Sequence, residues 1–145
     1  MDSILQQRAD DLMGELMLLP DPRERLSHLI DLARRDPPLP ESERIEANEV
    51  EGCMSTLWLA ASFEQGLCRF RCQSDALVVQ AIAGLLCRFY DQTPPHDILR
   101  HSPDFLAIAG ILDHLSSNRR NALSRVWKII RLFAAQHQQP ATATT

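Results

Sequence analysis

The sequence has no long apolar run, no excess of basic residues and no recognisable export signal. No window carries the roughly 18 consecutive apolar residues of a membrane-spanning helix, so no membrane span is expected. The formal net charge is -4, so the chain lacks the excess of basic residues that is typical of a nucleic-acid-binding domain. The first residues include no basic segment followed by an apolar one, so no secretory signal is expected. Four cysteines without such a signal predict reduced thiols and a cytoplasmic location.

The common catalytic and metal-binding motifs are also missing. The five glycines form no phosphate-binding loop or dinucleotide fingerprint, and no G-x-S-x-G, C-x-x-C or H-E-x-x-H occurs. Cys68 and Cys72 fall on a predicted strand, where they would stand roughly 13 Å apart. That separation is too long for one metal ion at thiolate bond lengths of about 2.3 Å. Cys87 lies in the most apolar predicted helix. We expect all three of these cysteines to pack in the core as small hydrophobes.

The hydrophobic periodicity predicts an α+β protein. Helical spacing or proline and cap signals favour helices over residues 3–19, 22–35, 76–90, 96–100 and 104–109, and a last helix that begins at Ser116 or Ser117. Alternating patterns predict strands over residues 56–63 and 67–72, joined as an antiparallel hairpin. The fold expected is a small antiparallel β-sheet packed by helices. We predict one domain over residues 1–137 and a flexible tail over residues 138–145.

Two local signals refine this prediction. Ser74 is expected to cap the helix that follows the hairpin, with Asp75 favouring its positive N-terminal end. Residues 37–51 read as a long polar connection that is rich in proline and glutamate. Long connections of this kind inside compact domains are usually functional or disordered.

Cys53 is the most informative single residue, because it lies on the loop that follows this connection. Gly52 gives the backbone freedom to present the sulfur at a turn. The neighbouring carboxylates of Glu49 and Glu51 are expected to disfavour the thiolate. This environment predicts an acceptor thiol whose reactivity depends on the active site of a partner, rather than a self-activated nucleophile. A nucleophilic pair of Cys53 with His114 stays open as an alternative.

The last predicted helix carries a cluster of basic residues. Two interpretations remain for it: a solvated helix face, or a contact surface for an acidic partner. The residues concerned are Arg119, Arg120, Arg125, Lys128 and Arg131.

Four segments stand in order across residues 20–135, namely PPLP at 37–40, GCMSTLW at 52–58, SDA at 74–76 and LSSNRRNAL at 115–123. Together they resemble the SufE family. The cysteine loop at 52–58 resembles the family box G-C-x-S-x-V-W, and the last segment resembles L-S-x-S-R-x-x-G-L. The chain departs from the family pattern at Met54, Leu57, Asn118 and Ala122.

The resemblance implies a persulfide relay. Cys53 would accept sulfane sulfur from a PLP-dependent cysteine desulfurase, activate that enzyme and deliver the sulfur to an iron–sulfur scaffold complex. Gly52 and Ser55 would shape the loop, and Asp75 and Arg119 would contact the partner. No cofactor, metal or independent enzymatic activity is implied, and neither nucleic acid nor membrane is expected as a partner. The implied fold is similar to that of SufE and NifU proteins, and a homodimer is left open.

Three other functions remain open. An iron–sulfur or zinc scaffold of related fold would need further ligands near Cys53. An independent thiol enzyme would need a strongly depressed Cys53 pKa. A helical adaptor would need no thiol at all.

Overall fold

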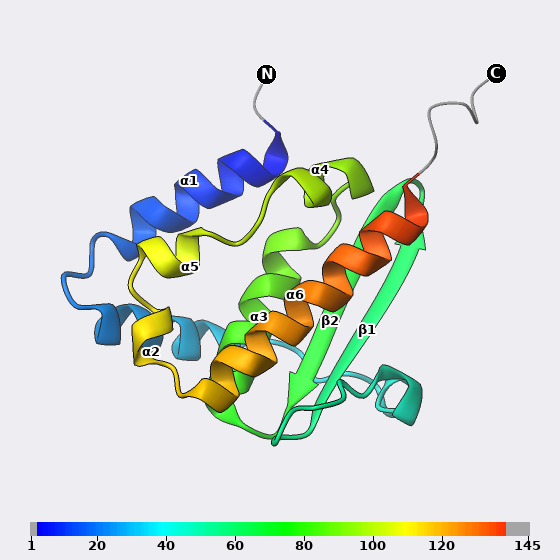
Figure 1. Ribbon diagram of the computed structural model, residues 1–145, viewed down its shortest axis with the longest axis horizontal. Helices are drawn as coiled ribbons and strands as arrows, with labels where there is room; N and C mark the ends of the chain where they lie inside the picture. Colours follow the sequence, from blue (N-terminus) through cyan, green and yellow to red (C-terminus); the bar gives the residue numbers. More distant parts are fainter. Residues whose placement is uncertain (1–2, 139–145) are drawn as a thin grey trace.

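A computed structural model describes residues 3–138 and shows helices packed on one β-hairpin (Figure 1). The α-helices are α1 (Ile4–Leu16), α2 (Pro22–Ala33), α3 (Leu77–Tyr90), α4 (Pro95–Arg100), α5 (Phe105–Ile108) and α6 (Ser117–His137). The strands are β1 (Leu57–Glu64) and β2 (Leu67–Ser74). Short 3-10 turns are η1 (Glu41–Glu43), η2 (Glu46–Asn48) and η3 (Leu112–His114). Of the predicted tail, residues 139–145 lie outside the described residues.

The two strands form the predicted antiparallel hairpin. Their register runs from Leu57 opposite Ser74 to Glu64 opposite Leu67. The two turn residues Gln65 and Gly66 have φ values of 53° and 80°, as a tight hairpin turn with the twist of the strands requires. This hairpin, covered by helices, confirms the α+β class.

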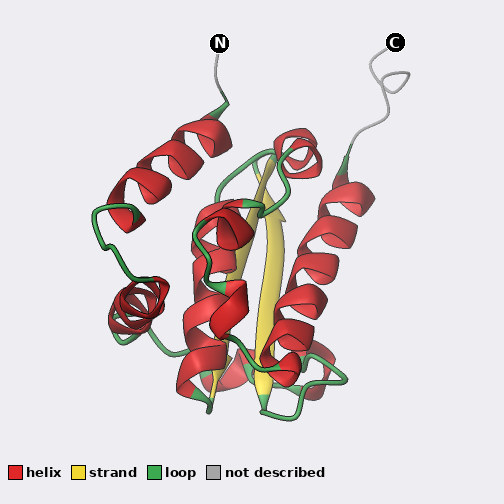
Figure 2. Cartoon of the chain, turned by 60° about the vertical axis from the view of Figure 1, so that its left-hand side comes forward, coloured by secondary structure: helices red, strands yellow, loops and turns green. Residues whose placement is uncertain are grey.

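Helix α3 is the centre of the core. It packs against β2 on one side and against α2 and α6 on the others, and its residues 81–87 are all buried. In Figure 2, α3 and α6 run across the same face of the hairpin, while α1 and α2 lie beyond α3. A helix that is apolar nearly all round is stable only when neighbours cover it on every side, as here. No helix within residues 3–138 is long and apolar enough to cross a membrane.

Helix α1 ends three residues earlier than its apolar pattern predicts. Leu5 and Leu16 are fully buried, but the chain leaves the helix after Leu16. Arg25 of α2 explains this end, because its Nε donates to the carbonyl oxygens of Leu16 at 3.1 Å and Leu19 at 2.9 Å. A longer helix could not pair the Leu16 carbonyl internally, because residue 20 is a proline and has no N–H. The Arg25 side chain supplies a donor to these carbonyl groups at the end of the helix.

Ser74 does not cap α3, contrary to the prediction. It is the last residue of β2, and the N-cap position of α3 is Ala76, which makes no side-chain capping bond. The Ser74 hydroxyl instead donates to the Thr56 carbonyl oxygen at 2.8 Å and accepts from the Ala76 N–H. It therefore ties the start of β1 to the turn into α3. The predicted cap of the last helix is confirmed, since the Ser116 hydroxyl accepts from the Arg119 N–H.

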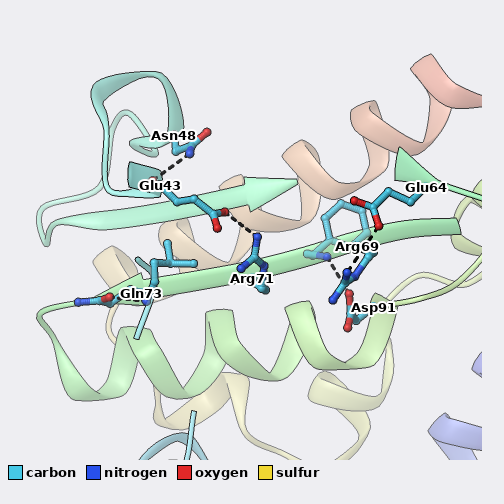
Figure 3. Close-up of polar contacts among 9 residues, drawn as sticks. Glu43, Asn48, Glu64, Arg69, Arg71, Gln73 and Asp91 are labelled. Carbon is cyan, nitrogen blue, oxygen red and sulfur yellow. Dashed lines mark hydrogen bonds and ion pairs between the residues drawn. The ribbon is translucent and has the colours of Figure 1, made fainter. Parts of the chain in front are cut away.

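The acidic connection of residues 37–51 is more ordered than the sequence predicts. It contains η1 and η2, and its Leu39 and Val50 are buried. Figure 3 shows how it is held to the hairpin: Glu43 pairs with Arg71 of β2 at 2.7 Å. The amide of Asn48 also donates to the Glu43 carbonyl oxygen at 2.9 Å. These contacts fix the segment that leads into the Cys53 loop.

Candidate functional site: the Cys53 loop

The Cys53 loop, residues 51–56, is fixed at both ends by backbone contacts. On one side the Val50 N–H donates to the Leu57 carbonyl oxygen at 2.8 Å, and Glu49 forms an isolated antiparallel bridge with Trp58. On the other side Thr56 accepts the hydrogen bond of Ser74. The residues between these anchors are free of strand geometry, so the thiol is presented from a short, closed loop.

Cys53 lines a hollow between the loop and two helices. Cys53 is half-buried, whereas the neighbouring Met54 side chain is 82% exposed. The hollow has a volume of about 360 Å³. It is lined by Cys53, Met54 and Ser55 from the loop, Val79 from α3, and Ser116, Asn118, Arg119 and Ala122 at the start of α6. A partner can therefore reach the thiol from solvent, over a surface made by three separate segments.

Arg125 lies beside the Cys53 loop, a position that the sequence did not indicate, since it named Arg125 only as one of the basic residues of the last helix. Gly52 has a φ of 83°, and a Cβ built on it would lie 2.5 Å from the Arg125 Nε. The guanidinium thus lies directly against the glycine, and any larger residue would have to displace it. One turn earlier on α6, the Asn121 side-chain amide donates to the Gly52 carbonyl oxygen at 3.1 Å. Helix α6 therefore holds Gly52 at two points.

Burial and Arg125 act in opposite directions on the thiol. Burial raises the pKa of Cys53 above its ordinary value, and the positive charge of Arg125 opposes this rise. A raised pKa agrees with the expectation that the Cys53 thiol is not activated on its own. The cause differs from the predicted one, because partial burial rather than the nearby glutamates raises the pKa.

The structure brings together most of the predicted site residues. Gly52 and Ser55 belong to the loop, and Arg119 lines the same hollow as Cys53. Asp75 is different: it is exposed in the turn between β2 and α3 and does not line the hollow. Its backbone N–H faces the Thr56 carbonyl oxygen at 3.4 Å, next to the base of the loop.

The other three cysteines pack in the core, as predicted. Cys68, Cys72 and Cys87 are buried, and all four thiols are free. The Cys87 thiol contacts Cys72, and this contact together with burial raises its pKa well above the ordinary value. Within residues 3–138, no group of three His, Cys, Asp or Glu side chains is placed to hold a metal ion. His114, the other half of the alternative nucleophilic pair, is not among the residues that line the Cys53 hollow.

The model of one protein family, SufE (Fe-S metabolism associated domain), matches residues 10–134. The chain belongs to the SufE family. An uncharacterised SufE-like protein of Synechocystis is 29% identical over 118 residues, which cover 81% of this chain and 74% of that protein. One from Rhizobium meliloti is 28% identical over 127 residues, covering 84% of this chain and 91% of the relative. These findings confirm the resemblance and give this SufE protein a role in iron–sulfur metabolism and sulfur transfer.

Two further proteins are similar to this chain, one a longer plant protein and the other a solved structure. The Arabidopsis thaliana SufE-like protein 1, named as chloroplastic/mitochondrial, is 27% identical over 128 residues that cover 88% of this chain but 34% of that longer protein. The solution structure of a hypothetical protein from Thermus thermophilus matches with a TM-score of 0.69 at 24% identity, covering 92% of this chain and 94% of the other. This structural match concerns the fold alone.

Proposed function

We propose that this SufE protein accepts sulfane sulfur on Cys53 from a PLP-dependent cysteine desulfurase and delivers it to an iron–sulfur scaffold complex. The observation that carries the proposal is the placement of Cys53, a half-buried residue that lines an open hollow, while the other three cysteines are buried. A relay needs one accessible sulfur and a surface for a partner around it, and both occur here.

The transfer step is a thiol exchange. Cys53 first loses its proton, and the thiolate attacks the outer sulfur of the desulfurase persulfide. A new sulfur–sulfur bond forms on Cys53 as the one on the desulfurase breaks. The desulfurase cysteine leaves as a thiolate, which takes up a proton. No net oxidation occurs, because the sulfane sulfur only changes its carrier.

This step also explains how the protein would activate its partner. A desulfurase that still holds its persulfide cannot begin another cycle at that cysteine. Removal of the sulfur by Cys53 regenerates the free desulfurase cysteine, so desulfurase turnover rises when transfer is faster than release to small thiols. The raised pKa of Cys53 suits such a dependent acceptor, since thiolate character and exposure control adventitious oxidation.

Asp75 and Arg119 are proposed as partner contacts on the two sides of the loop. Both side chains are exposed, and in the described part of the chain neither forms an ion pair. Opposite charges flanking a reactive loop favour docking in one orientation. The proposal places the protein in the cytoplasm, where thiols stay reduced.

Intact-mass spectrometry tests the relay. The protein is incubated with a cysteine desulfurase and L-cysteine, beside a Cys53→Ser variant as control. A reducible gain of one sulfur atom on the wild type, and none on the variant, is expected. A gain on both proteins would contradict the assignment to Cys53, and a gain on neither would contradict the relay.

The scaffold alternative makes a different prediction. A scaffold would retain iron or zinc after anaerobic purification, and Cys53→Ser would lower the metal content. In the structure the remaining three thiols are buried among apolar side chains and none lines the Cys53 hollow. The geometry therefore favours the relay over the scaffold.

A further inference from the structure

We propose that Arg125 is a positioning residue for Cys53: with Asn121 it holds Gly52 against α6, and it supplies positive charge to the sulfur when that sulfur is an anion. Arg125 lies outside the four segments that resemble the family, and Asn121 stands at an unspecified position within the segment 115–123. The effect on sulfur transfer rests on the proposed function, whereas the effect on the loop itself does not.

The contact between Arg125 and Gly52 is the first support. The guanidinium occupies the space where a Cβ of residue 52 would be, with Nε and one terminal nitrogen each 2.5 Å from that position. The glycine is therefore required both by its φ of 83° and by the arginine beside it. A planar group lying against the backbone restricts the loop at the residue directly before the thiol.

The hydrogen bond of Asn121 is the second support. Its amide donates to the Gly52 carbonyl oxygen at 3.1 Å, across 69 residues of sequence. Asn121 and Arg125 are four residues apart, so they lie one turn apart on the same face of α6. Two contacts on one glycine fix its position better than either does alone, and they fix the adjacent Cys53 with it.

The charge of Arg125 is the third support. Two arginines of α6 lie near the loop: Arg119 lines the Cys53 hollow, and Arg125 lies behind Gly52. Arg125 is the one whose charge opposes the rise of the Cys53 pKa caused by burial. A guanidinium stays protonated at any physiological pH, so it is available whenever a thiolate or a persulfide anion forms.

The groups around Arg125 leave it available for this role. Arg125 lines a second hollow, separate from the Cys53 hollow, together with Glu46, Glu49 and Glu51 of the acidic segment and Lys128 of α6. Within residues 3–138, none of these carboxylates forms an ion pair with Arg125. On the Cys53 side, α3 contributes only the apolar Val79 to the hollow. The acidic segment therefore weakens the field of Arg125 but does not capture its side chain.

The pH dependence of Cys53 alkylation by iodoacetamide, followed by intact mass, tests both parts of the proposal. Arg125→Lys and Arg125→Gln both lose the flat guanidinium against Gly52, but only Lys keeps the charge. We expect both to raise the alkylation rate of the fully ionised thiol several-fold, because the loop is freed. The midpoint of the pH profile should lie higher for Gln than for Lys, since a cation favours the thiolate.

Two further variants separate the loop contact from the charge. Asn121→Ala removes one contact and no charge, so the rate at high pH should rise as well. Lys128→Gln removes a positive charge one turn away that does not contact Gly52, and it should match the wild type. Unchanged rates in both the Arg125 and Asn121 variants would overturn the positioning role. A common midpoint for the Lys and Gln variants would overturn the charge effect.

Sulfur transfer then shows whether the positioning matters for function. With desulfurase and L-cysteine at neutral pH, Arg125→Gln should gain sulfur more slowly than Arg125→Lys. If no protein gains sulfur, including the wild type, the proposed relay fails while the alkylation data still decide the role of Arg125. If all variants gain sulfur at the wild-type rate, the relay stands and the role of Arg125 in it is overturned.

Discussion

Gly52→Ala, compared with Gly66→Ala, separates the backbone cost of a glycine from its role at the Cys53 loop. The two glycines have nearly equal φ values of 83° and 80°. Alanine in this left-handed region costs about 1–2 kcal/mol, and its smaller unfolded-state entropy offsets about 0.4–1 kcal/mol. The expected net loss in the free energy of unfolding is about 1 kcal/mol for each variant, or roughly 2–4 °C in Tm.

The surroundings of the two positions differ, and so should the behaviour of the thiol. A Cβ at Gly66 meets nothing within 4 Å, whereas a Cβ at Gly52 meets the Arg125 guanidinium. The arginine is exposed and can swing away, so the clash adds little to the loss of stability. Its departure removes the contact that holds the loop. Gly52→Ala should therefore speed alkylation of the fully ionised Cys53, while Gly66→Ala leaves that rate unchanged.

Urea unfolding and alkylation followed by intact mass are the two assays required. Equal alkylation rates for Gly52→Ala and the wild type would refute the argument that Arg125 restrains the loop through Gly52. A Gly66→Ala variant as stable as the wild type would refute the backbone cost assigned to the left-handed region. A faster rate in both variants would show that general loosening, and not the local contact, controls the thiol.

Three further predictions concern the core and its thiols. Arg8→Ala removes a guanidinium that donates at 2.7 Å to two backbone carbonyl oxygens at the C-terminal end of α3. Urea unfolding should show that the free energy of unfolding falls by about 1.5–3 kcal/mol. A fall of less than about 0.5 kcal/mol would contradict this prediction. Tyr90→Phe removes the hydrogen bond from a fully buried tyrosine to the His101 carbonyl oxygen and should lower the free energy of unfolding by about 1–3 kcal/mol in the same assay. A variant as stable as the wild type would contradict this prediction. Burial raises the pKa of Cys68 to about 11, whereas an unfolded thiol has a pKa of about 8.5. Because the unfolded chain then releases the proton first, the free energy of unfolding should fall as pH rises through this window. The fall should be less steep in Cys68→Ala, and an equal slope would count against the buried, neutral thiol.

The sequence predicted the elements of the fold well where periodicity and turn chemistry agree. The hairpin followed from alternation around Gly66, and the central helix followed from residues 76–90, which are apolar nearly all round apart from Gln80 and Arg88. Boundaries were less certain because tertiary contacts decide them. The α1 prediction ran to Leu19, but Arg25 of the next helix takes the carbonyl groups at that end.

The candidate site was predictable only in part. Cys53 stood out because it follows a glycine on a loop and matches a family motif, and Arg119 lines the same hollow. Arg125 appeared only as one of several basic residues on the last helix. Its contact with Gly52 joins two segments that are far apart in the sequence, and no local pattern encodes such a contact.

The most direct test of the relay is a single-turnover transfer measured on both partners at once. A desulfurase is loaded with L-cysteine, freed of excess substrate and mixed with this protein, and the intact mass of each is followed in time. The proposed relay predicts that the sulfur lost from the desulfurase appears on Cys53 in equal amount, and that Cys53→Ser leaves it on the desulfurase. Loss of the desulfurase persulfide without any gain on Cys53 would contradict the relay.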